Sequence, residues 1–251
     1  MPENLVSGRG AGRTFFVADL HLTDERPAAT GRFFRFLEED VAGSDALYIL
    51  GDLFEAWIGD DHDERVAHDT AVRLKTLSAA GTPVFFLHGN RDFMLAQTYA
   101  RQAGMHLIVD PSVIDLYGTP TLLMHGDTLC SDDIPYQNFR RRVRRPLVLA
   151  LLRHLPFALR KRLARQARAG SESAKAGKTA EIMDVNPGAV ERAFNSHGAC
   201  RLIHGHTHRP ARHAHRVGQA ACERWVLPDW YDRWGYVVCD SHGCRLELPA
   251  L

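Results

Sequence analysis

Five short clusters in this chain carry side chains that bind metal ions. They are Asp19-Leu20-His21, Gly51-Asp52, Gly89-Asn90-Arg91-Asp92, His125-Gly126-Asp127 and Gly205-His206-Thr207-His208. Carboxylate, carboxamide and imidazole groups are oxygen and nitrogen donors that suit manganese, iron, zinc or magnesium, and no soft sulfur is present in the clusters to select copper. The set holds more donors than one ion needs, so it predicts a centre of two metal ions.

Each cluster follows a short apolar run that is typical of a buried strand. The predicted strands cover residues 14–18, 46–50, 83–87, 121–124 and 201–203. Ligands that follow neighbouring strands of an α/β sheet converge on one crevice at the carboxyl ends of those strands. We therefore expect the five clusters to meet in space, although they are far apart in the sequence.

The segments between the strands predict an α/β fold with an insertion. Apolar residues at helical spacing predict helices near 27–42, 64–80 and 93–103, and this alternation of strand and helix is typical of α/β layers. Residues 134–196 read as helical without a strand, with the last helix after Pro187. Strands resume at 201–203 and then at 223–227, 235–239 and 244–248. We expect a core domain of residues 1–133 and 197–251 and an inserted helical cap of residues 134–196.

The five clusters and their order resemble the calcineurin-like metallophosphoesterases. The resemblance covers residues 14–127 and 201–208, and it implies a β-sandwich of two mixed sheets flanked by helices. It also implies that one ion is held by Asp19, His21, Asp52 and His208. Asp52 would bridge to a second ion, which Asn90, His125 and His206 complete. We expect two Mn²⁺ ions, although other divalent ions suit the same donors. Asp92 and Asp127 are expected to orient ligands without binding metal.

The third cluster departs from the pattern of many family members, which carry histidine where this chain has Arg91. Arginine stays protonated and is a poor general acid, but its planar fork binds phosphate well. This suits a leaving group that needs no proton, such as a phosphate monoester, whose second pKa is about 6. Arg91 therefore favours the cleavage of a pyrophosphate, and we count Asn90, Arg91 and Asp92 as the catalytic residues.

Arg91 and three further segments resemble one subgroup, the UDP-2,3-diacylglucosamine diphosphatases of lipid A synthesis. The matching segments are residues 125–133, 182–186 and 206–210. The resemblance implies that water attacks the α-phosphorus of the UDP-diacylglucosamine substrate and releases UMP and 2,3-diacylglucosamine 1-phosphate (lipid X). The substrate-binding residues that it implies are Asn90, Arg91, Asp133, Ser171, Lys175, Lys178 and His206.

The predicted cap is both basic and apolar. Residues 134–170 contain no Asp or Glu, while arginines and leucines recur throughout. One interpretation is a solvated basic face on a packing helix. A second is a nucleic-acid site, but base stacking would require more aromatic side chains between the basic residues. The third interpretation, which we favour, is a surface that binds acyl chains and rests on an anionic membrane. We expect no nucleic-acid partner and see no sign of an obligate protein partner.

Composition places this chemistry in a soluble protein of a reducing compartment. The cysteines are odd in number and form no Cys-x-x-Cys pair, which weighs against a disulfide framework. No signal peptide or membrane-spanning run is present, so we expect a cytoplasmic protein that is peripheral on the cytoplasmic face of the inner membrane. A general phosphodiesterase of soluble nucleotides and a non-catalytic scaffold with the same fold remain as alternatives.

Overall fold

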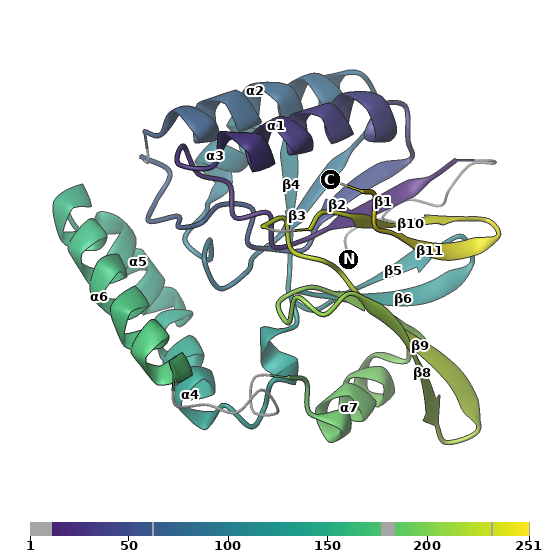
Figure 1. The fold of residues 1–251 in the computed structure, drawn as a ribbon. Coiled ribbons are helices and arrows are strands. Elements are labelled where there is room, and N and C mark those ends of the chain that lie inside the picture. The colour runs from purple at the N-terminus through teal and green to yellow at the C-terminus, as the bar shows by residue number, and fades with distance from the viewer. Residues whose placement is uncertain (1–11, 62, 177–183, 232, 251) are drawn as a thin grey trace.

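Two mixed β-sheets pack face to face in the computed structural model, which describes residues 12–61, 63–176, 184–231 and 233–250 (Figure 1). For residues 171–176 it describes the backbone alone. The first sheet has the strand order β11-β10-β1-β2-β3-β4. Its strands are β1 (Thr14–Val17), β2 (Ala46–Ile49), β3 (Val84–Leu87), β4 (Met105–Ile108), β10 (Tyr236–Asp240) and β11 (Gly243–Glu247). β1 to β4 run parallel, while β10 and β11 join as antiparallel strands.

The second sheet has the order β5-β6-β7-β9-β8. Its strands are β5 (Ser112–Leu116), β6 (Thr119–Met124), β7 (Arg201–His204), β8 (Ala211–Val217) and β9 (Ala220–Val226). β6, β7 and β9 are parallel, and the antiparallel strands β5 and β8 form the two edges. Both sheets therefore present parallel strands in their centre, whose carboxyl ends can carry a common site.

The alternation of side chains along β1 explains why the first sheet is buried on both faces. Phe15 and Val17 point into a core beneath α1 (Pro27–Phe36), α2 (Arg65–Ala79) and α3 (Gln97–Gln102), whereas Phe16 points into the core between the sheets. A third core lies on the outer face of the second sheet, where α7 (Pro187–His197) packs through Val190 and Phe194. The expected sandwich of two mixed sheets flanked by helices is confirmed.

Two helices and three strands differ from the predicted elements. The helix expected at 27–42 is α1 followed by a π-helical turn, η1 (Leu37–Val41), and the helix expected at 93–103 is reduced to α3. β4, β5 and β8 were not predicted. β4 and β8 lie at the edges of their sheets, and β8 exposes arginine and histidine side chains, so neither gives the apolar run of a central strand.

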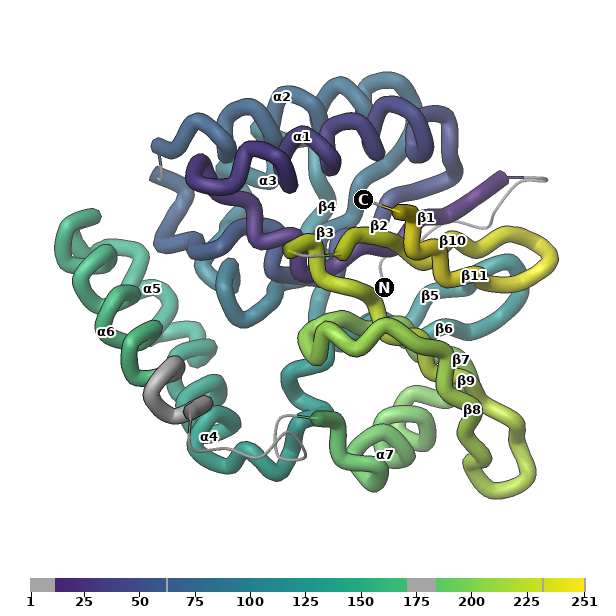
Figure 2. The backbone as a smooth tube through the Cα atoms, viewed as in Figure 1, coloured from purple at the N-terminus to yellow at the C-terminus, as the bar shows by residue number. Residues whose placement is uncertain are grey.

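Three helices extend from one side of the sandwich: α4 (Ile134–Val143), α5 (Pro146–His154) and α6 (Phe157–Ala176) (Figures 1 and 2). α5 touches the first core through Leu149 and Leu152 but leaves Leu147 86% exposed. α7 belongs to the predicted range of the cap by sequence, yet it packs against the second sheet. The division into core and cap remains a proposal. Within the described residues, none of the helices has the length and apolar character to cross a membrane.

One pair of cysteines is bonded, which a reducing compartment does not predict. A disulfide joins Cys239 of β10 to Cys244 of β11. The two residues are directly opposed in the antiparallel pairing of these strands, and such a pairing brings two thiols together without a framework of several bridges. Cys130, Cys200 and Cys222 are free of disulfides.

Tyr48 offers a test of the core between the sheets. Its ring stacks between Phe16 and Phe85, with centroid distances of 5.1 and 4.7 Å. The buried hydroxyl has no hydrogen-bond partner among the described residues. We expect Tyr48→Ala to lower the free energy of unfolding by roughly 3–5 kcal/mol, because it removes a fully buried ring.

Tyr48→Phe is the matched control, since it keeps the ring and removes only the unpaired hydroxyl. We expect its stability to equal or exceed that of the parent protein, because a buried hydroxyl without a partner costs free energy. Urea unfolding followed by circular dichroism measures both variants. A loss of stability in the Phe variant as large as that in the Ala variant would contradict this description of the core.

Candidate metal centre

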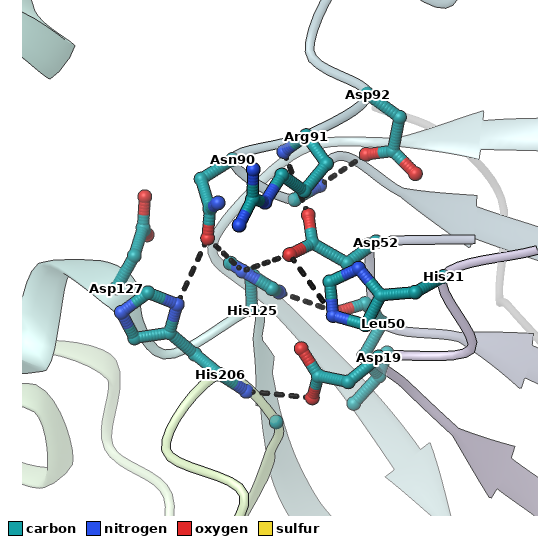
Figure 3. A network of polar contacts seen from close by, with 12 residues as sticks. Asp19, His21, Leu50, Asp52, Asn90, Arg91, Asp92, His125, Asp127 and His206 are labelled. Atoms are coloured by element: carbon teal, nitrogen blue, oxygen red, sulfur yellow. Dashed lines mark hydrogen bonds and ion pairs between the residues drawn. The ribbon is translucent and has the colours of Figure 1, made fainter. Parts of the chain in front are cut away.

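The five clusters converge on one site at the carboxyl ends of the central strands (Figure 3). Asp19, Asp52 and Asn90 follow β1, β2 and β3 of the first sheet, while His125 and His206 follow β6 and β7 of the second. Five residues of the clusters adopt a positive φ, a backbone conformation that is uncommon outside glycine and occurs in tight turns. These are Asp19 (φ 54°), His21 (φ 49°), Asp52 (φ 54°), His206 (φ 69°) and His208 (φ 54°).

Glycines allow these turns to approach one another closely. A Cβ atom on Gly51, whose φ is +91°, would lie 2.5 Å from the backbone of Gly89. A Cβ atom on Gly205 would lie 2.3 Å from a carboxylate oxygen of Asp19. Gly51 and Gly205 are therefore explained by close packing between loops and not by a role in chemistry.

One group of potential ligands consists of Asp19, His21 and His208, whose donor atoms lie within 4.8 Å of one another. Oδ1 of Asp19 and both ring nitrogens of His21 are buried and have no hydrogen-bond partner among the described residues. Nε2 of His208 lies 3.3 Å from Oδ1 of Asp19. Buried polar atoms without partners are rare in proteins, and a cation between these donors would satisfy them. This group fits a metal ion.

A second group surrounds the carboxylate of Asp52. Its Oδ2 lies 3.9 Å from Nε2 of His21 and 3.8 Å from Nε2 of His125, so it faces both groups. Oδ1 of Asn90 lies 3.0 Å from Nε2 of His125 and 2.9 Å from Nδ1 of His206. The donors of Asp52, Asn90, His125 and His206 thus point to a common place, and the central position of Asp52 suits a bridging carboxylate.

Burial and charge shift the pKa values of these groups strongly. Burial raises the pKa of Asp52 to about 7, against the nearby charge of His125. Burial also lowers the pKa of His21 to about 3 and that of His206 to about 4. His125 is different: desolvation is outweighed by the carboxylates of Asp52 and Asp19, which raise its pKa to about 9. Without a cation, the site therefore attracts protons to offset its carboxylates.

Two acidic residues that face histidines of the site were missed by the sequence analysis. Oδ2 of Asp229 lies 3.1 Å from Nδ1 of His208, which leaves Nε2 directed to Asp19. Together these carboxylates raise the pKa of His208 to about 10, although desolvation opposes the shift. A carboxyl oxygen of Glu55 similarly faces Nδ1 of His21 at 3.7 Å. Neither residue lies in one of the clusters, so no local pattern reveals them.

Asp92 holds the third cluster in place. It is completely buried, and its two carboxyl oxygens accept hydrogen bonds from the backbone N–H groups of Gly89 (2.8 Å) and Leu53 (2.7 Å). Asp92 therefore ties the loop of Asn90 to the loop of Asp52. These bonds suit a residue that orients the loops of the potential ligands.

Arg91 is anchored by its backbone while its guanidinium stays available. Its N–H donates to Oδ1 of Asp52 at 2.8 Å, and its carbonyl accepts from the N–H of Trp57 at 2.9 Å. In the described part of the chain, no hydrogen bond or ion pair engages the guanidinium. Figure 3 shows this side chain next to Asn90, at the rim of the group around Asp52. A cationic fork beside a metal centre suits a phosphate ligand.

Other predicted residues lie further from the cluster. Asp127 accepts hydrogen bonds from Tyr136 and from Arg140 of α4 (2.7 Å to Nε), so it connects the loop of His125 to α4. Asp133 accepts a hydrogen bond from the N–H of Tyr136 at 3.2 Å and thereby caps α4. The backbone alone is described for Ser171 and Lys175, and Lys178 lies outside the described residues.

Metal binding should release protons, because an imidazole must be neutral at the nitrogen that ligates. His125 and His208, with pKa values of about 9 and 10, carry protons at neutral pH in the metal-free site. We expect the apparent affinity for Mn²⁺ to rise as pH increases from about 6 to 9, by up to about tenfold per pH unit for each proton displaced. Calorimetric titration in two buffers of different ionisation enthalpy counts the protons.

Asp229→Asn is the control, since it removes a carboxylate that stabilises the protonated form of His208. This variant should release fewer protons on metal binding. Binding heats that are identical in the two buffers would show that no proton leaves the site.

Comparison with known proteins places the chain in a family. The model of the calcineurin-like phosphoesterase family matches residues 12–210. The chain is 49% identical to the UDP-2,3-diacylglucosamine hydrolase of Xanthomonas axonopodis pv. citri, covering 95% of this chain and 99% of the relative. It is 50% identical to the protein of that name from Xanthomonas oryzae pv. oryzae, with the same coverage. The corresponding protein of Stenotrophomonas maltophilia is 49% identical, covering 94% of this chain and 98% of that one. With its ligand clusters gathered in one centre, the chain belongs to the calcineurin-like phosphoesterase family.

Proposed function

We propose that the protein hydrolyses the pyrophosphate bond of UDP-2,3-diacylglucosamine, releasing UMP and 2,3-diacylglucosamine 1-phosphate. One observation carries the proposal: among the described residues the guanidinium of Arg91 forms no hydrogen bond or ion pair, and it lies beside the convergent donors of the metal centre. Arginine binds phosphate but does not protonate a leaving group, so this arrangement suits a phosphate monoester as the leaving group. The names of relatives that match almost the whole chain support the same substrate.

The centre is proposed to hold two divalent ions, Mn²⁺ being our choice of metal. Asp19, His21, Asp52 and His208 would hold one ion, and Asp52, Asn90, His125 and His206 the other. Such a pair supplies Lewis acidity and an activated water when bound. The support is the set of buried donors without hydrogen-bond partners around Asp19 and His21, together with the position of Asp52 between the two groups.

The residues of the third cluster are proposed to divide the remaining work. Arg91 would bind the oxygens of the phosphate that is attacked, with Asn90 and His206 beside it. Asp92 would keep these side chains in place through its bonds to the backbone of Gly89 and Leu53. Asp133, Ser171, Lys175 and Lys178 are proposed to contact the glucosamine or nucleotide parts of the substrate.

The three helices α4, α5 and α6 are proposed to receive the acyl chains and to rest on an anionic membrane. Leu147 and Leu151 of α5 are 86% and 65% exposed, and Phe157, Leu159 and Leu163 of α6 are partly exposed. Arg141 of α4 and Arg162 of α6 are exposed on the same group of helices. Each buried CH₂ contributes about 0.8 kcal/mol, so a lipid with two acyl chains stays in the bilayer and the enzyme must come to it. We therefore propose that the protein works as a peripheral protein on the cytoplasmic face of the inner membrane.

A single assay separates this function from its alternatives. Purified protein with Mn²⁺ is offered UDP-2,3-diacylglucosamine, a cyclic nucleotide and a short DNA duplex, and product release is followed for each. We expect UMP from the first substrate alone. Equal turnover of the cyclic nucleotide would favour a general phosphodiesterase, while an absence of any turnover would favour a non-catalytic scaffold.

Arg91→Ala tests the role of the guanidinium. The backbone N–H that bonds to Asp52 is retained in this variant, so the metal centre should keep its ions. We expect turnover to fall by about 10²–10³-fold, the loss that follows removal of a group that stabilises developing charge. Metal content is measured by mass spectrometry of the protein after gel filtration.

Arg91→Lys is the matched control, because it keeps the charge but loses the planar fork. It should restore part of the turnover lost in the Ala variant. If the Ala variant loses metal together with activity, then Arg91 supports the centre and is not mainly a phosphate ligand.

A further inference from the structure

The carboxylate of Glu55 contacts both the metal centre and α6. On one side its Oε2 lies 3.7 Å from Nδ1 of His21 and accepts a hydrogen bond of 2.9 Å from the hydroxyl of Tyr231. The same oxygen pairs with Arg26 at 2.5 Å. On the other side it forms an ion pair of 2.6 Å with Arg168 of α6. The Glu55 side chain is only 13% exposed, so solvent screens these contacts little. One buried carboxylate thus joins a potential metal ligand to a helix outside the sandwich.

His21 needs such a partner to fix its ring. Its ring stacks on Tyr231 at a centroid distance of 4.9 Å, which fixes the plane of the imidazole but not the direction of its nitrogens. Neither nitrogen has a hydrogen bond in the described part of the structure. A histidine that ligates a metal through one nitrogen usually donates the other N–H to a carboxylate. Glu55 is the carboxylate that faces Nδ1.

We propose that Glu55 is a positioning residue that couples the docking of α6 to the orientation of His21, so that metal binding and helix docking favour each other. A cation held by Nε2 of His21 would keep the proton on Nδ1, the nitrogen that faces Glu55. The carboxylate then receives a donor from the metal centre through Oε2, which Arg26 and Tyr231 also contact, while Oε1 pairs with Arg168 of α6. Because coupling between two sites is reciprocal, a docked α6 must also strengthen metal binding. The inference rests on the proposed metal centre and not on the proposed substrate.

Two other arginines of these helices contact the core away from His21. Arg160 of α6 donates to the carbonyl of Ile58 at 2.7 Å and pairs with Asp61. Arg144, at the end of α4, donates to the carbonyl of Gly89 at 2.7 Å. These contacts hold the helices whether or not His21 is ordered. The pair of Glu55 and Arg168 is therefore where metal-dependent docking should appear.

Hydrogen exchange of α6 with and without Mn²⁺ tests the coupling in the full chain and without substrate. In the parent protein, Mn²⁺ should slow exchange over residues 157–170. Glu55→Gln and Arg168→Gln should abolish this response, since each removes one side of the shared ion pair. Arg165→Gln removes the same charge from the same helix. Arg165 is exposed, and among the described residues its hydrogen bond is to the carbonyl of Lys161, also in α6. This variant should retain the response of the parent.

Mn²⁺ affinity, measured by competition with a fluorescent chelator, gives the reciprocal readout. We expect Glu55→Gln to weaken binding about tenfold, the usual cost of losing a partner of a metal-bound histidine, and Arg165→Gln to leave it unchanged. A Glu55→Gln variant that keeps both the parent affinity and the Mn²⁺ response of α6 would overturn the proposal. Failure of the diphosphatase assay would not, because neither measurement uses a substrate.

Discussion

The burial of two carboxylates next to each other is the constraint on which this structure depends. Asp19 and Asp52 are 0% and 2% exposed, and they lie in adjacent loops. Burying a charge without compensation costs several kcal/mol, so each oxygen needs a donor or a cation. The backbone N–H of His206 donates a hydrogen bond to Asp19, and the backbone N–H of Arg91 donates one to Asp52. The remaining charge is offset by protons on His125 and His208 or by metal ions, and this links the site to divalent cations.

The same constraint explains why the site depends on so large a fold. Asp19, His21, Asp52 and His208 adopt positive φ, which costs free energy for residues other than glycine. Such turns persist because the strands before them are fixed in two packed sheets with buried cores on three faces. Asp92 adds two backbone hydrogen bonds that lock neighbouring loops together. The packing of the sandwich thus compensates for the unfavourable backbone conformations of the turns that follow its strands.

The sequence predicted those elements that have a recognisable local pattern of residues. The apolar runs before Asp19, Asp52 and Asn90 predicted three central strands to within one residue at either end, because strands buried on both faces need continuous apolar sequence. β8 escaped prediction, since an edge strand with exposed arginines has no such run. Asp229 and Glu55 also escaped, because each is defined by the histidine that it faces and not by its neighbours in the chain. Contacts of this kind appear only once the fold is known.

The basic helices illustrate how tertiary contacts change the meaning of composition. From the sequence, every arginine between residues 134 and 170 counts equally toward attraction to an anionic surface. In the structure, Arg140 and Arg168 are paired with the carboxylates of Asp127 and Glu55, and Arg160 is 5% exposed. A paired arginine offers little attraction to a membrane, where a free basic residue contributes roughly 1 kcal/mol. The proposed membrane contact therefore rests on the exposed arginines and on the leucines of α5, while Arg140, Arg160 and Arg168 hold the helices against the core.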